Sequence, residues 1–550
     1  MNLFFYSFLT CIYCYNILLH SGYGGRSHIK SVLEISDLLV LRGHQVKYLG
    51  LEDNLDYLKG YNITGHLLGP PLQKDQKQIQ HEMKLTIMNK ESRSNPMKAM
   101  ANSVFPLMEL NYDQTYLSLK QYILNNFDLI DLMICDFIAN ACIDLAKQYS
   151  IPLIVTMQTT DGLGITHSPY VINNLEYGPL YTNELSLLQR IKALIINPIK
   201  GIYYLMPLIN RLNKIRKKYN VSKSYTVFGD NENYSLNLAN TFTGFEPAIN
   251  LQPNLHHIGP ILSKIITEIE NYLNIKSKVL YVGFGSLSVL NEELSEQLML
   301  LLLKLIDNEI FDGIIISLGK TELKDIKKEI LFNNQYYNIH KMIKFNNNDN
   351  IKFYSWTPQT NILNHDNVKL FLSHCGLESS FESIAAKKPI LCMPLFGDQF
   401  RNTRKLSDLG ISKYVDKDNI NFQLIIQDIL YLLNDNLVQM NLLKTNQMIG
   451  NTEDKIQYAA TLIEQHINLA KLCRPLQPYK KNEIPCELSH LIPKKNKYFY
   501  QLYNMDIYFL FLFFIFSSLL ILIYYLLSLT YFYLKYTNFL VQDSPKIKLF

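Results

Sequence analysis

Several polar residues in the second half of the chain have the types and spacing needed to hold a phosphate group. Ser379 lies in the predicted first turn of a helix that opens at the sharp turn around Gly376. The N-terminus of a helix exposes free backbone N–H groups and the positive end of the helix dipole, and both favour an anion. His374, just before the turn, can add a ring N–H to the same oxygens. Together these residues predict a phosphate site.

Further side chains nearby suit the remainder of a nucleotide. Glu382 follows Ser379 by about one helical turn, where a carboxylate can accept hydrogen bonds from both hydroxyls of a ribose. Trp356, the only tryptophan of the chain, can stack on a base, and Gln359 can support that base from the side. The pattern favours a pocket for a nucleoside diphosphate. The alternative is an ordinary strand–helix–strand unit with a core tryptophan and incidental polar residues.

The elements expected around these residues bring them to one edge of a sheet. Short apolar runs such as Val368–Leu372 and Pro389–Leu395 end at a glycine or a polar residue, and a helical pattern follows. This alternation is typical of a parallel sheet with crossover helices. Ligands of such sheets lie beyond the carboxyl ends of the strands, which is where the polar residues fall. The sequence therefore predicts an α/β fold with a ligand site at that edge.

The order of these residues matches a known signature. It reads W-x-P-Q, H-x-G-x-x-S-x-x-E, a proline, and P-x-x-x-D-Q-x-x-N, formed by Trp356, Pro358, Gln359, His374, Gly376, Ser379, Glu382, Pro389, Pro394, Asp398, Gln399 and Asn402. This arrangement resembles the signature of the UDP-glycosyltransferase family, in the membrane-bound animal type that transfers glucuronate or glucose. The resemblance implies a GT-B fold, in which two Rossmann-like domains, each a doubly wound parallel sheet, face each other across a cleft.

The resemblance also implies that a UDP-sugar donor is bound by Ser286, Trp356, Gln359, His374, Gly376, Ser379, Glu382, Asp398 and Gln399. In this arrangement the tryptophan would stack on uracil, and Gln359 and Glu382 would hold the ribose. The diphosphate would lie between His374 and the helix N-terminus at Ser379.

The remaining donor residues would contact the sugar or the opposite side of the diphosphate. Asp398 and Gln399 would hold the sugar hydroxyls. Ser286 ends a Gly283-Phe-Gly285-Ser286 sequence that resembles a family loop facing the diphosphate across the cleft. The alternative for this loop is a plain tight turn.

Two positions depart from the family pattern. Glu378 stands where asparagine is usual, so its charge would lie close to the phosphates and would repel Glu382 on the same helix. Lys387 stands where glycine is usual, so we expect the turn to Pro389 to be built differently. Both departures concern donor affinity and donor choice, and neither removes a catalytic group.

His28 is the candidate general base. It stands at the head of a predicted helix, Lys30–Arg42, after a strand and a glycine-rich loop. A histidine with an ordinary pKa of about 6.5 is largely neutral at pH 7 and can take a proton from a hydroxyl. In the family that this chain resembles, a histidine in this loop deprotonates the acceptor and an aspartate orients it. Asp136, which follows the buried run Phe127–Cys135, is the expected partner, and Asp131 within that run is the competing candidate.

The composition of the chain limits the classes of partner and cofactor that we expect it to bind. The chain has 550 residues, of which 48% are hydrophobic and 18% charged, and a formal net charge of +5. This length allows two domains with cores of their own, and so mild a charge argues against nucleic acid as a partner. The cysteines are scattered, so no metal site is expected, and no other cofactor is implied. Cys473 and Cys486 can form a disulfide or remain free thiols.

Both ends of the chain suggest targeting to a membrane. Residues 1–15 are interpreted as a signal peptide, although they lack its basic start and cleavage motif. Ile507–Leu534 carries no charge, and at about 1.5 Å per residue it exceeds a membrane core of about 30 Å. The lysine-bearing tail, 535–550, is expected in the cytosol. Lys546 and Lys548 match the K-x-K-x-x retrieval signal, so we expect a single-pass type I protein of the endoplasmic reticulum membrane with lumenal catalytic domains.

The stretch Leu187–Tyr219 mixes apolar and basic residues at near-helical spacing. It is either a helix on the membrane surface or a buried helix pair of the acceptor domain. The second reading, with one side facing a membrane, is the expectation.

The expected organisation is a signal peptide (1–15), an acceptor-binding Rossmann-like domain (16–250), a linker (251–265), a UDP-sugar-binding Rossmann-like domain (266–470), a returning juxtamembrane segment (471–506), a transmembrane helix (507–534) and a cytosolic tail (535–550). The predicted reaction is an inverting transfer of a hexose or hexuronate from a UDP-sugar to a hydroxyl of a small lipophilic acceptor, with His28 as base and Asp136 as its support. The alternatives are another GT-B enzyme, such as a sterol or lipid glycosyltransferase or an epimerase, and a non-catalytic UDP-sugar-binding relative. The sequence identifies neither the sugar nor the acceptor, and it leaves open whether the chain forms a homo-oligomer.

Overall fold

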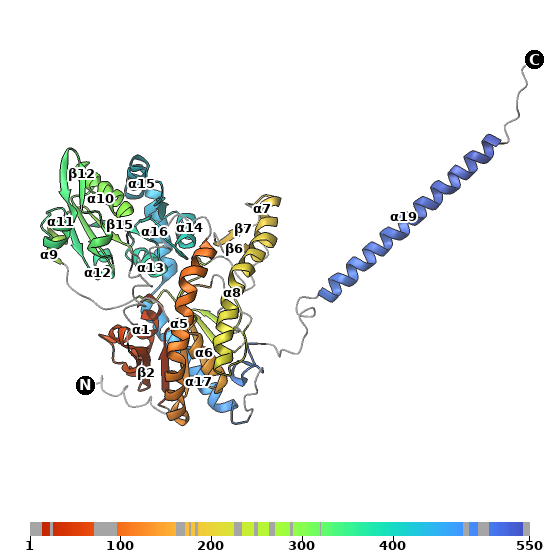
Figure 1. Ribbon diagram of the computed structural model, residues 1–550, viewed down its shortest axis with the longest axis horizontal. Helices are drawn as coiled ribbons and strands as arrows, with labels where there is room; N and C mark the ends of the chain where they lie inside the picture. The colour runs from red at the N-terminus through yellow and green to blue at the C-terminus, as the bar shows by residue number, and fades with distance from the viewer. Residues whose placement is uncertain are drawn as a thin grey trace, which may run out of the picture. The chain divides into compact units, whose positions relative to one another are not determined.

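The computed structural model (Figure 1) describes residues 14–22, 26–70, 96–160, 171–174, 178–181, 185–224, 234–246, 251–262, 270–285, 290–319, 321–476, 483–492 and 505–542. The chain divides into two units, Met1–Ile492 and Pro493–Phe550. Nearly all of the predicted signal peptide lies outside the described residues, as do Ser286 and the lysines of the retrieval signal.

The first unit contains two parallel sheets, each at the centre of a lobe. The sheet of the first lobe has seven strands in the order β3-β2-β1-β4-β5-β8-β9. Their bounds are β1 Asn16–His20, β2 Gln45–Leu51, β3 Thr64–Gly69, β4 Leu132–Asp136, β5 Leu153–Met157, β8 Leu236–Ala239 and β9 Leu255–His257. Every residue of β4 and β5 is buried, because helices cover both faces of the sheet. The predicted Rossmann-like sheet is confirmed.

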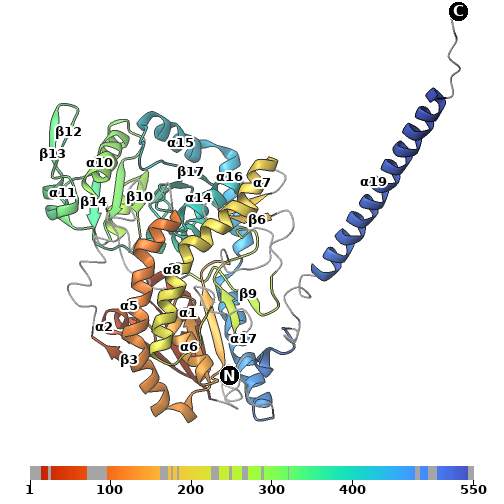
Figure 2. The same cartoon turned by 45° about the vertical axis from the view of Figure 1, so that its right-hand side comes forward.

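Helices from distant parts of the chain cover this sheet. On one face, α1 (Lys30–Leu41) and α17 (Thr452–Cys473) share one apolar core with the strands. On the other face, α5 (Pro96–Asn125) and α6 (Asn140–Gln148) form a second core. Helix α17 follows the second sheet in the sequence and then returns to the first lobe, as Figure 2 shows.

The sheet of the second lobe has six strands in the order β14-β11-β10-β15-β16-β17. Their bounds are β10 Val279–Gly283, β11 Gly313–Ser317, β14 Ile351–Tyr354, β15 Val368–Ser373, β16 Ile390–Cys392 and β17 Ser412–Tyr414. The helices of this lobe include α10 Glu292–Asp307, α11 Ile339–Phe345, α12 Gln359–Asn364, α13 Leu377–Ala385, α14 Gln399–Asp408, α15 Phe422–Asn434 and α16 Asn436–Ile449. A hairpin of β12 (Glu329–Phe332) and β13 (Gln335–Asn338) extends from the lobe. Both sheets therefore have the strand order of the Rossmann fold.

Some local expectations differ from the structure. The buried run Phe127–Cys135 is not one strand, because Phe127–Leu129 forms a 3-10 turn and β4 begins only at Leu132. Within the segment expected as a linker, Leu255–His257 forms the edge strand β9.

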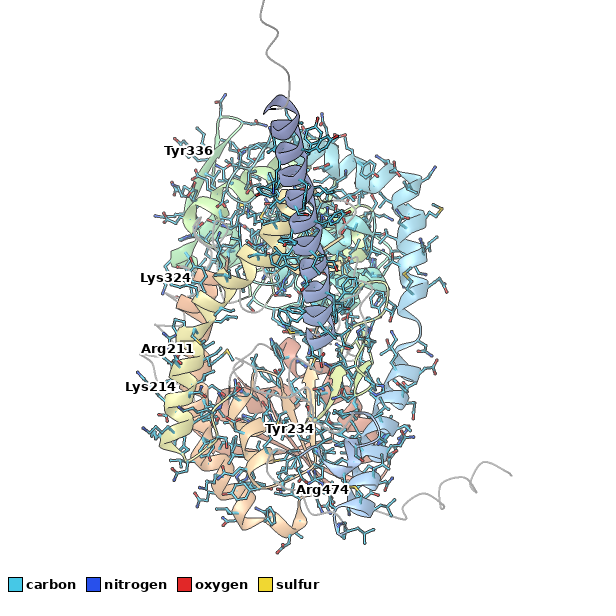
Figure 3. All side chains as sticks on the ribbon, turned by 90° about the vertical axis from the view of Figure 1, so that its right-hand side faces the viewer. Arg211, Lys214, Tyr234, Lys324, Tyr336 and Arg474 are labelled. Carbon is cyan, nitrogen blue, oxygen red and sulfur yellow. A yellow bond between two sulfur atoms is a disulfide. The ribbon has the colours of Figure 1, made fainter. Side chains whose placement is uncertain are left out.

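The basic and apolar stretch after residue 186 forms consecutive helical segments, α7 (Leu187–Ile191), a π-helical turn (Lys192–Ile196) and α8 (Asn197–Lys218). Its first part, which we call the exposed apolar segment (187–206), exposes 40–78% of the side chains of Leu187, Leu188, Ile191, Leu194, Ile195, Ile196, Ile199, Ile202, Tyr203 and Met206. The later part packs on α5, with Leu208 and Leu212 fully buried. Arg211 pairs with Glu109 of α5, and Figure 3 shows Arg211 and Lys214 along this part of the helix. The later part agrees with the expected packing against the acceptor domain, whereas the first part, although Ala193 is buried, exposes most of its apolar side chains.

The second unit contains α19 (Met505–Gln542). Its portion Met505–Thr537 is long and apolar enough to cross a membrane, and it is not buried against other residues. This portion contains the predicted span Ile507–Leu534.

Candidate active site

The predicted general base, His28, is paired with Asp136. A short 3-10 helix, Arg26–His28, follows β1, and Asp136 ends the adjacent strand β4, so both residues lie at the carboxyl edge of the first sheet. His28 Nδ1–H donates to Asp136 Oδ2 at 2.8 Å. The backbone N–H of Ile138 donates to the other carboxylate oxygen at 3.0 Å. A carboxylate held in this way fixes the histidine tautomer and leaves Nε2 as the proton acceptor.

The surroundings of His28 are half-buried and acidic. Its ring stacks on Phe137 with centroids 5.8 Å apart, and the side chain is 25% exposed. Burial lowers the pKa of His28, but the charge of Asp136 and its hydrogen bond raise the pKa by more, with smaller contributions from Asp398 and Glu378. The net result is a raised pKa, so the ring is protonated over a wider pH range than an ordinary histidine.

Asp131, the competing candidate, lies before the start of β4 rather than after its end. Its Oδ2 accepts the backbone N–H of Asn16 at 2.8 Å, and its Oδ1 pairs with Lys471 Nζ at 2.8 Å. These contacts tie β1 and α17 together, so the carboxylate is structural and the competing hypothesis is wrong.

In the second lobe, His374 and Gly376 form the predicted turn between β15 and α13. Gly376 precedes the first residue of α13, and a Cβ atom there would lie 2.4 Å from His374 Nε2. A Cβ atom at Gly285 would lie 2.6 Å from the same nitrogen. The imidazole therefore occupies a space that two glycines leave open.

His374 is buried and electrically neutral near pH 7. Burial lowers its pKa to about 4, although the charge of Asp398 and a backbone hydrogen bond with Gly283 act in the opposite direction. Within the described parts of the chain, its Nδ1 has no hydrogen-bond partner. A buried nitrogen without a partner is costly unless a ligand or water satisfies it. Because a neutral imidazole carries a single N–H, Nδ1 can donate to an oxygen of a ligand only in the tautomer in which Nε2 is unprotonated.

The predicted ribose residues already form a hydrogen-bonded group. Gln359 Nε2 donates to Glu382 Oε2 at 2.5 Å and to Ser379 Oγ at 2.9 Å. Thr360 Oγ1–H donates to Glu382 Oε1 at 2.8 Å. Trp356 follows β14 and is 58% exposed, which leaves its indole ring accessible for stacking. The structure thus brings Gln359, Ser379 and Glu382 together as the sequence predicted.

The two residues predicted to hold the sugar differ from each other. Asp398 is partly exposed at the start of α14, and its charge acts on both His28 and His374, so it lies near the two histidines of the cleft. Gln399 is buried, and its Oε1 accepts the backbone N–H groups of Leu395 at 2.7 Å and Phe396 at 3.0 Å. Gln399 therefore has only its amide N–H groups to offer a sugar.

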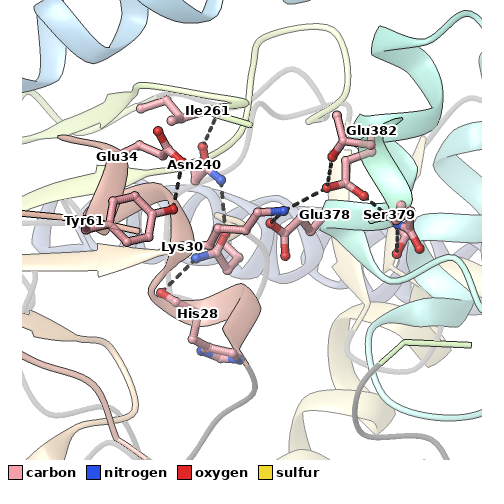
Figure 4. A network of polar contacts seen from close by, with 12 residues as sticks. His28, Lys30, Glu34, Tyr61, Asn240, Ile261, Glu378, Ser379 and Glu382 are labelled. Atoms are coloured by element: carbon pink, nitrogen blue, oxygen red, sulfur yellow. Dashed lines mark hydrogen bonds and ion pairs between the residues drawn. The ribbon is translucent and has the colours of Figure 1, made fainter. Parts of the chain in front are cut away.

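Lys30 is a site residue that the sequence reasoning missed (Figure 4). It begins α1 in the first lobe, and its Nζ lies 2.8 Å from Glu378 Oε1 and 2.8 Å from Glu382 Oε1, both on α13 of the second lobe. The charge of Glu378, which we expected to lie close to the phosphates and to repel Glu382, is thus met by a cation from the first lobe that pairs with both glutamates. The unusual glutamate was the available signal, but its partner is about 350 residues away in the sequence.

The turn after α13 corrects another expectation. Lys387 has φ 56°, which is the left-handed conformation that a glycine usually supplies at this point. The turn is therefore not built differently, and Lys387 adopts the strained backbone with its Cβ in place. An L-residue in this conformation costs about 1–2 kcal/mol.

Two disulfides lie beside site residues and were not foreseen. Cys135–Cys142 joins the end of β4, next to Asp136, to α6. Cys375–Cys392 joins the residue after His374 to the end of β16. The Cys473–Cys486 disulfide, one of two open alternatives, is also formed. Scattered cysteines without a spacing motif give no signal for such pairs.

Comparison with known proteins identifies the family. The family profile described as UDP-glucoronosyl and UDP-glucosyl transferase matches residues 23–451. The chain belongs to this family. As a UDP-glycosyltransferase it transfers a sugar from a UDP-sugar to an acceptor, and the predicted family is confirmed.

Individual relatives agree with this assignment. A UDP-glycosyltransferase of Talaromyces amestolkiae is 24% identical over 457 residues, covering 80% of this chain and 84% of the relative. The 2-hydroxyacylsphingosine 1-beta-galactosyltransferase of Homo sapiens is 23% identical over 267 residues, covering 47% of this chain and 44% of the relative. The crystal structure of the glycotransferase of kitacinnamycin superimposes with a TM-score of 0.56 at 15% identity, covering 82% of this chain and 98% of that one. The predicted GT-B fold is confirmed.

Proposed function

We propose that this UDP-glycosyltransferase transfers a hexose or hexuronate, with inversion, to a hydroxyl of a small lipophilic acceptor. The observation that supports this proposal is the hydrogen-bonded His28–Asp136 pair at the carboxyl edge of the first sheet. His28 Nε2 takes the proton of the acceptor hydroxyl while the hydroxyl oxygen forms a bond to C1 of the sugar. The bond from C1 to the diphosphate oxygen breaks, and its electron pair leaves on UDP. Asp136 stabilises the imidazolium that forms.

The proposed donor position follows the predicted roles in the second lobe. Uracil stacks on Trp356, the ribose hydroxyls meet Glu382, and the diphosphate lies between His374 and the N-terminus of α13. The neutral imidazole and the free N–H groups at the start of the helix stabilise the charge that develops on UDP. Because these groups provide the stabilisation, we propose no metal in the reaction.

A membrane location supports a lipophilic acceptor. We propose that α19 anchors the protein in a membrane and that the exposed apolar segment (187–206) of the first unit binds a lipid surface. Residues 186–218 contain several lysines and arginines but no aspartate or glutamate, which suits anionic headgroups. The three disulfides suit an oxidising compartment such as the lumen of the endoplasmic reticulum.

A lipid acceptor is the second candidate. The human relative is named as a galactosyltransferase acting on 2-hydroxyacylsphingosine, and the exposed apolar segment could receive an acceptor directly from a bilayer. A lipid acceptor and a small phenol or steroid would reach the cleft by different routes, but His28 would deprotonate the hydroxyl of either one in the same way.

The testing experiment measures UDP release by the full membrane-bound chain. UDP-glucose, UDP-glucuronate, UDP-galactose and UDP-N-acetylglucosamine are each combined with a panel of phenols, steroids and ceramides. We expect turnover with a preferred donor and acceptor, and a loss of about 10²–10⁴-fold in His28→Ala. Transfer that is undiminished in His28→Ala would refute the role of the base, and a product with retained anomeric configuration would refute the inverting step.

A further inference from the structure

Lys30 joins the two lobes at the donor side of the cleft. Glu378 and Glu382 are four residues apart on α13, so their side chains emerge on the same side of the helix. One ammonium group reaches both, at 2.8 Å from each carboxylate. The side chains of Lys30, Glu378 and Glu382 are 15%, 20% and 3% exposed, so water screens this group only weakly.

We propose that Lys30 is a donor-positioning residue, which offsets the charge of Glu378 so that the diphosphate can bind at the N-terminus of α13. The proposal rests on the donor placement given above. In the described residues, Lys30 is the only lysine or arginine within ion-pair distance of Glu378. Without it, the first turn of α13 would present an uncompensated carboxylate to an anionic ligand, which opposes the favourable effect of the helix dipole.

The number of hydrogen bonds that Glu382 can accept indicates which of the two glutamates pairs with Lys30 when the UDP-sugar is bound. Glu382 Oε1 already accepts from Lys30 and Thr360, and its Oε2 accepts from Gln359. A carboxylate can accept about four hydrogen bonds, and two ribose hydroxyls would need two of these positions. At least one of the three side chains that now donate to Glu382 therefore has to break its hydrogen bond when the ribose binds. Lys30 can release Glu382 and remain paired with Glu378, since the two contacts are separate. The pair with Glu378 is therefore the one that the proposal requires.

The first lobe fixes His28, two residues before Lys30, through a chain of hydrogen bonds drawn in Figure 4. The backbone N–H of Ile261 donates to Asn240 Oδ1 at 2.7 Å, and Asn240 Nδ2 donates to Gln158 at 3.3 Å. Gln158 Nε2 in turn donates to the backbone carbonyl of His28 at 3.2 Å. The start of α1 is thus fixed by the polypeptide that leaves the first lobe. The same short segment carries the catalytic base and the cation that faces the donor.

A double-mutant cycle tests the proposal in the full chain in detergent. The variants are Lys30→Met, Lys30→Arg, Glu378→Asn and the Lys30→Met/Glu378→Asn pair, and the measurement is the dissociation constant of UDP by calorimetry. We expect Lys30→Met to weaken UDP binding by about tenfold or more, since it leaves a carboxylate without its charge partner. Lys30→Arg should retain most of the affinity. In the Glu378→Asn background, Lys30→Met should have a much smaller effect, because only Glu382 remains of the two carboxylates that Lys30 contacts.

Three results for Lys30→Met would overturn the proposal: equal weakening in both backgrounds, tighter binding, or no effect. If Lys30→Met weakens UDP binding equally in the wild-type and the Glu378→Asn backgrounds, Lys30 acts independently of Glu378. If Lys30→Met strengthens UDP binding, Lys30 competes with the ribose for Glu382. The fluorescence of Trp356 tests the donor placement separately, because it is the only tryptophan of the chain. If UDP binds without changing this fluorescence, the donor placement is refuted. If the fluorescence changes but Lys30→Met leaves the affinity for UDP unaltered, only the role of Lys30 is refuted.

Discussion

Replacing Asp136 with asparagine separates the two tasks of the catalytic carboxylate. Its two oxygens accept two N–H donors, His28 Nδ1 at 2.8 Å and the backbone of Ile138 at 3.0 Å. An asparagine has a single carbonyl oxygen and an NH₂ group that cannot accept. If its oxygen keeps the bond to Ile138, its NH₂ faces His28 Nδ1. The proton of the imidazole then moves to Nε2, and the ring can no longer take a proton from an acceptor.

The size of the effect follows from the loss of the base. General-base catalysis contributes about 10²–10⁴-fold, which corresponds to about 3–5 kcal/mol in the activation free energy. We therefore expect kcat of Asp136→Asn to fall by about 10²–10⁴-fold. UDP affinity should change little, because Asp136 bonds to His28 and Ile138 and not to the residues proposed to hold UDP. The preferred UDP-sugar and acceptor, in a continuous UDP-release assay, provide the measurement.

The pH profile of kcat/KM gives a second readout. The pKa of His28 is raised, chiefly because Asp136 outweighs the opposing effect of burial. The base works only when neutral, so wild-type activity is present above this raised pKa and is lost as the pH falls through it. Asp136→Asn removes the main raising effect and leaves burial opposed only by Asp398 and Glu378, so the acidic limb should move to lower pH.

A matched control is available on the same stretch of chain. Asp131→Asn changes a carboxylate that bonds to Asn16 and Lys471 rather than to His28, so both kcat and the acidic limb should stay close to wild type. The reasoning would be refuted if Asp136→Asn retained most of its activity. An acidic limb that stayed in place or moved to higher pH would contradict it as well.

Three further predictions concern the supporting structure. Arg216 is fully buried and pairs with Asp144 at 2.7 Å, so Arg216→Met should lower the free energy of unfolding by about 3–5 kcal/mol in guanidinium titrations, and a change below about 1 kcal/mol would contradict this. Gly376→Ala places a Cβ atom 2.4 Å from His374 Nε2 and should raise the dissociation constant of UDP, measured by calorimetry. The expected rise is about 10–100-fold, from the loss of one hydrogen bond to a charged group; unchanged affinity would show that the imidazole does not contact the ligand. Lys387→Gly should raise the free energy of unfolding by about 1 kcal/mol, because glycine adopts a φ of 56° without strain. A loss of stability would show that the lysine side chain stabilises the fold by more than its backbone strain destabilises it.

Local patterns accounted for much of the donor side of the site. The strand ends before Trp356, His374 and Asp398 follow from short apolar runs and the helical patterns after them, and a parallel sheet brings such ends to one edge. The pairing of His28 with Asp136 was implied by the family resemblance, and the position of Asp136 at the end of a strand agreed with it. These predictions needed no knowledge of which distant segments touch.

Features that depend on contacts between distant segments were not predictable in this way. The ion pair of Lys30 with Glu378 joins different lobes, and neither residue belongs to a periodic pattern that refers to the other. Gln399 has the position of a sugar ligand, yet its side chain turns inward to the backbone of its own loop, which only coordinates reveal. Lys387 adopts a conformation that its residue type disfavours, because the surrounding turn determines the backbone there.

Helix α17 has a consequence for how the protein is made. The first strand of the first lobe begins at Asn16, but the helix that covers one face of its sheet ends at Cys473. A ribosome adding about 5–20 residues per second needs on the order of half a minute or more between the two. During that interval α1 has been synthesised while its packing partner does not yet exist, and the apolar surface that they share is open to misassociation. The nascent chain should therefore depend on chaperones until translation is nearly finished, and a gene truncated before α17 should yield an aggregating product rather than a free acceptor lobe.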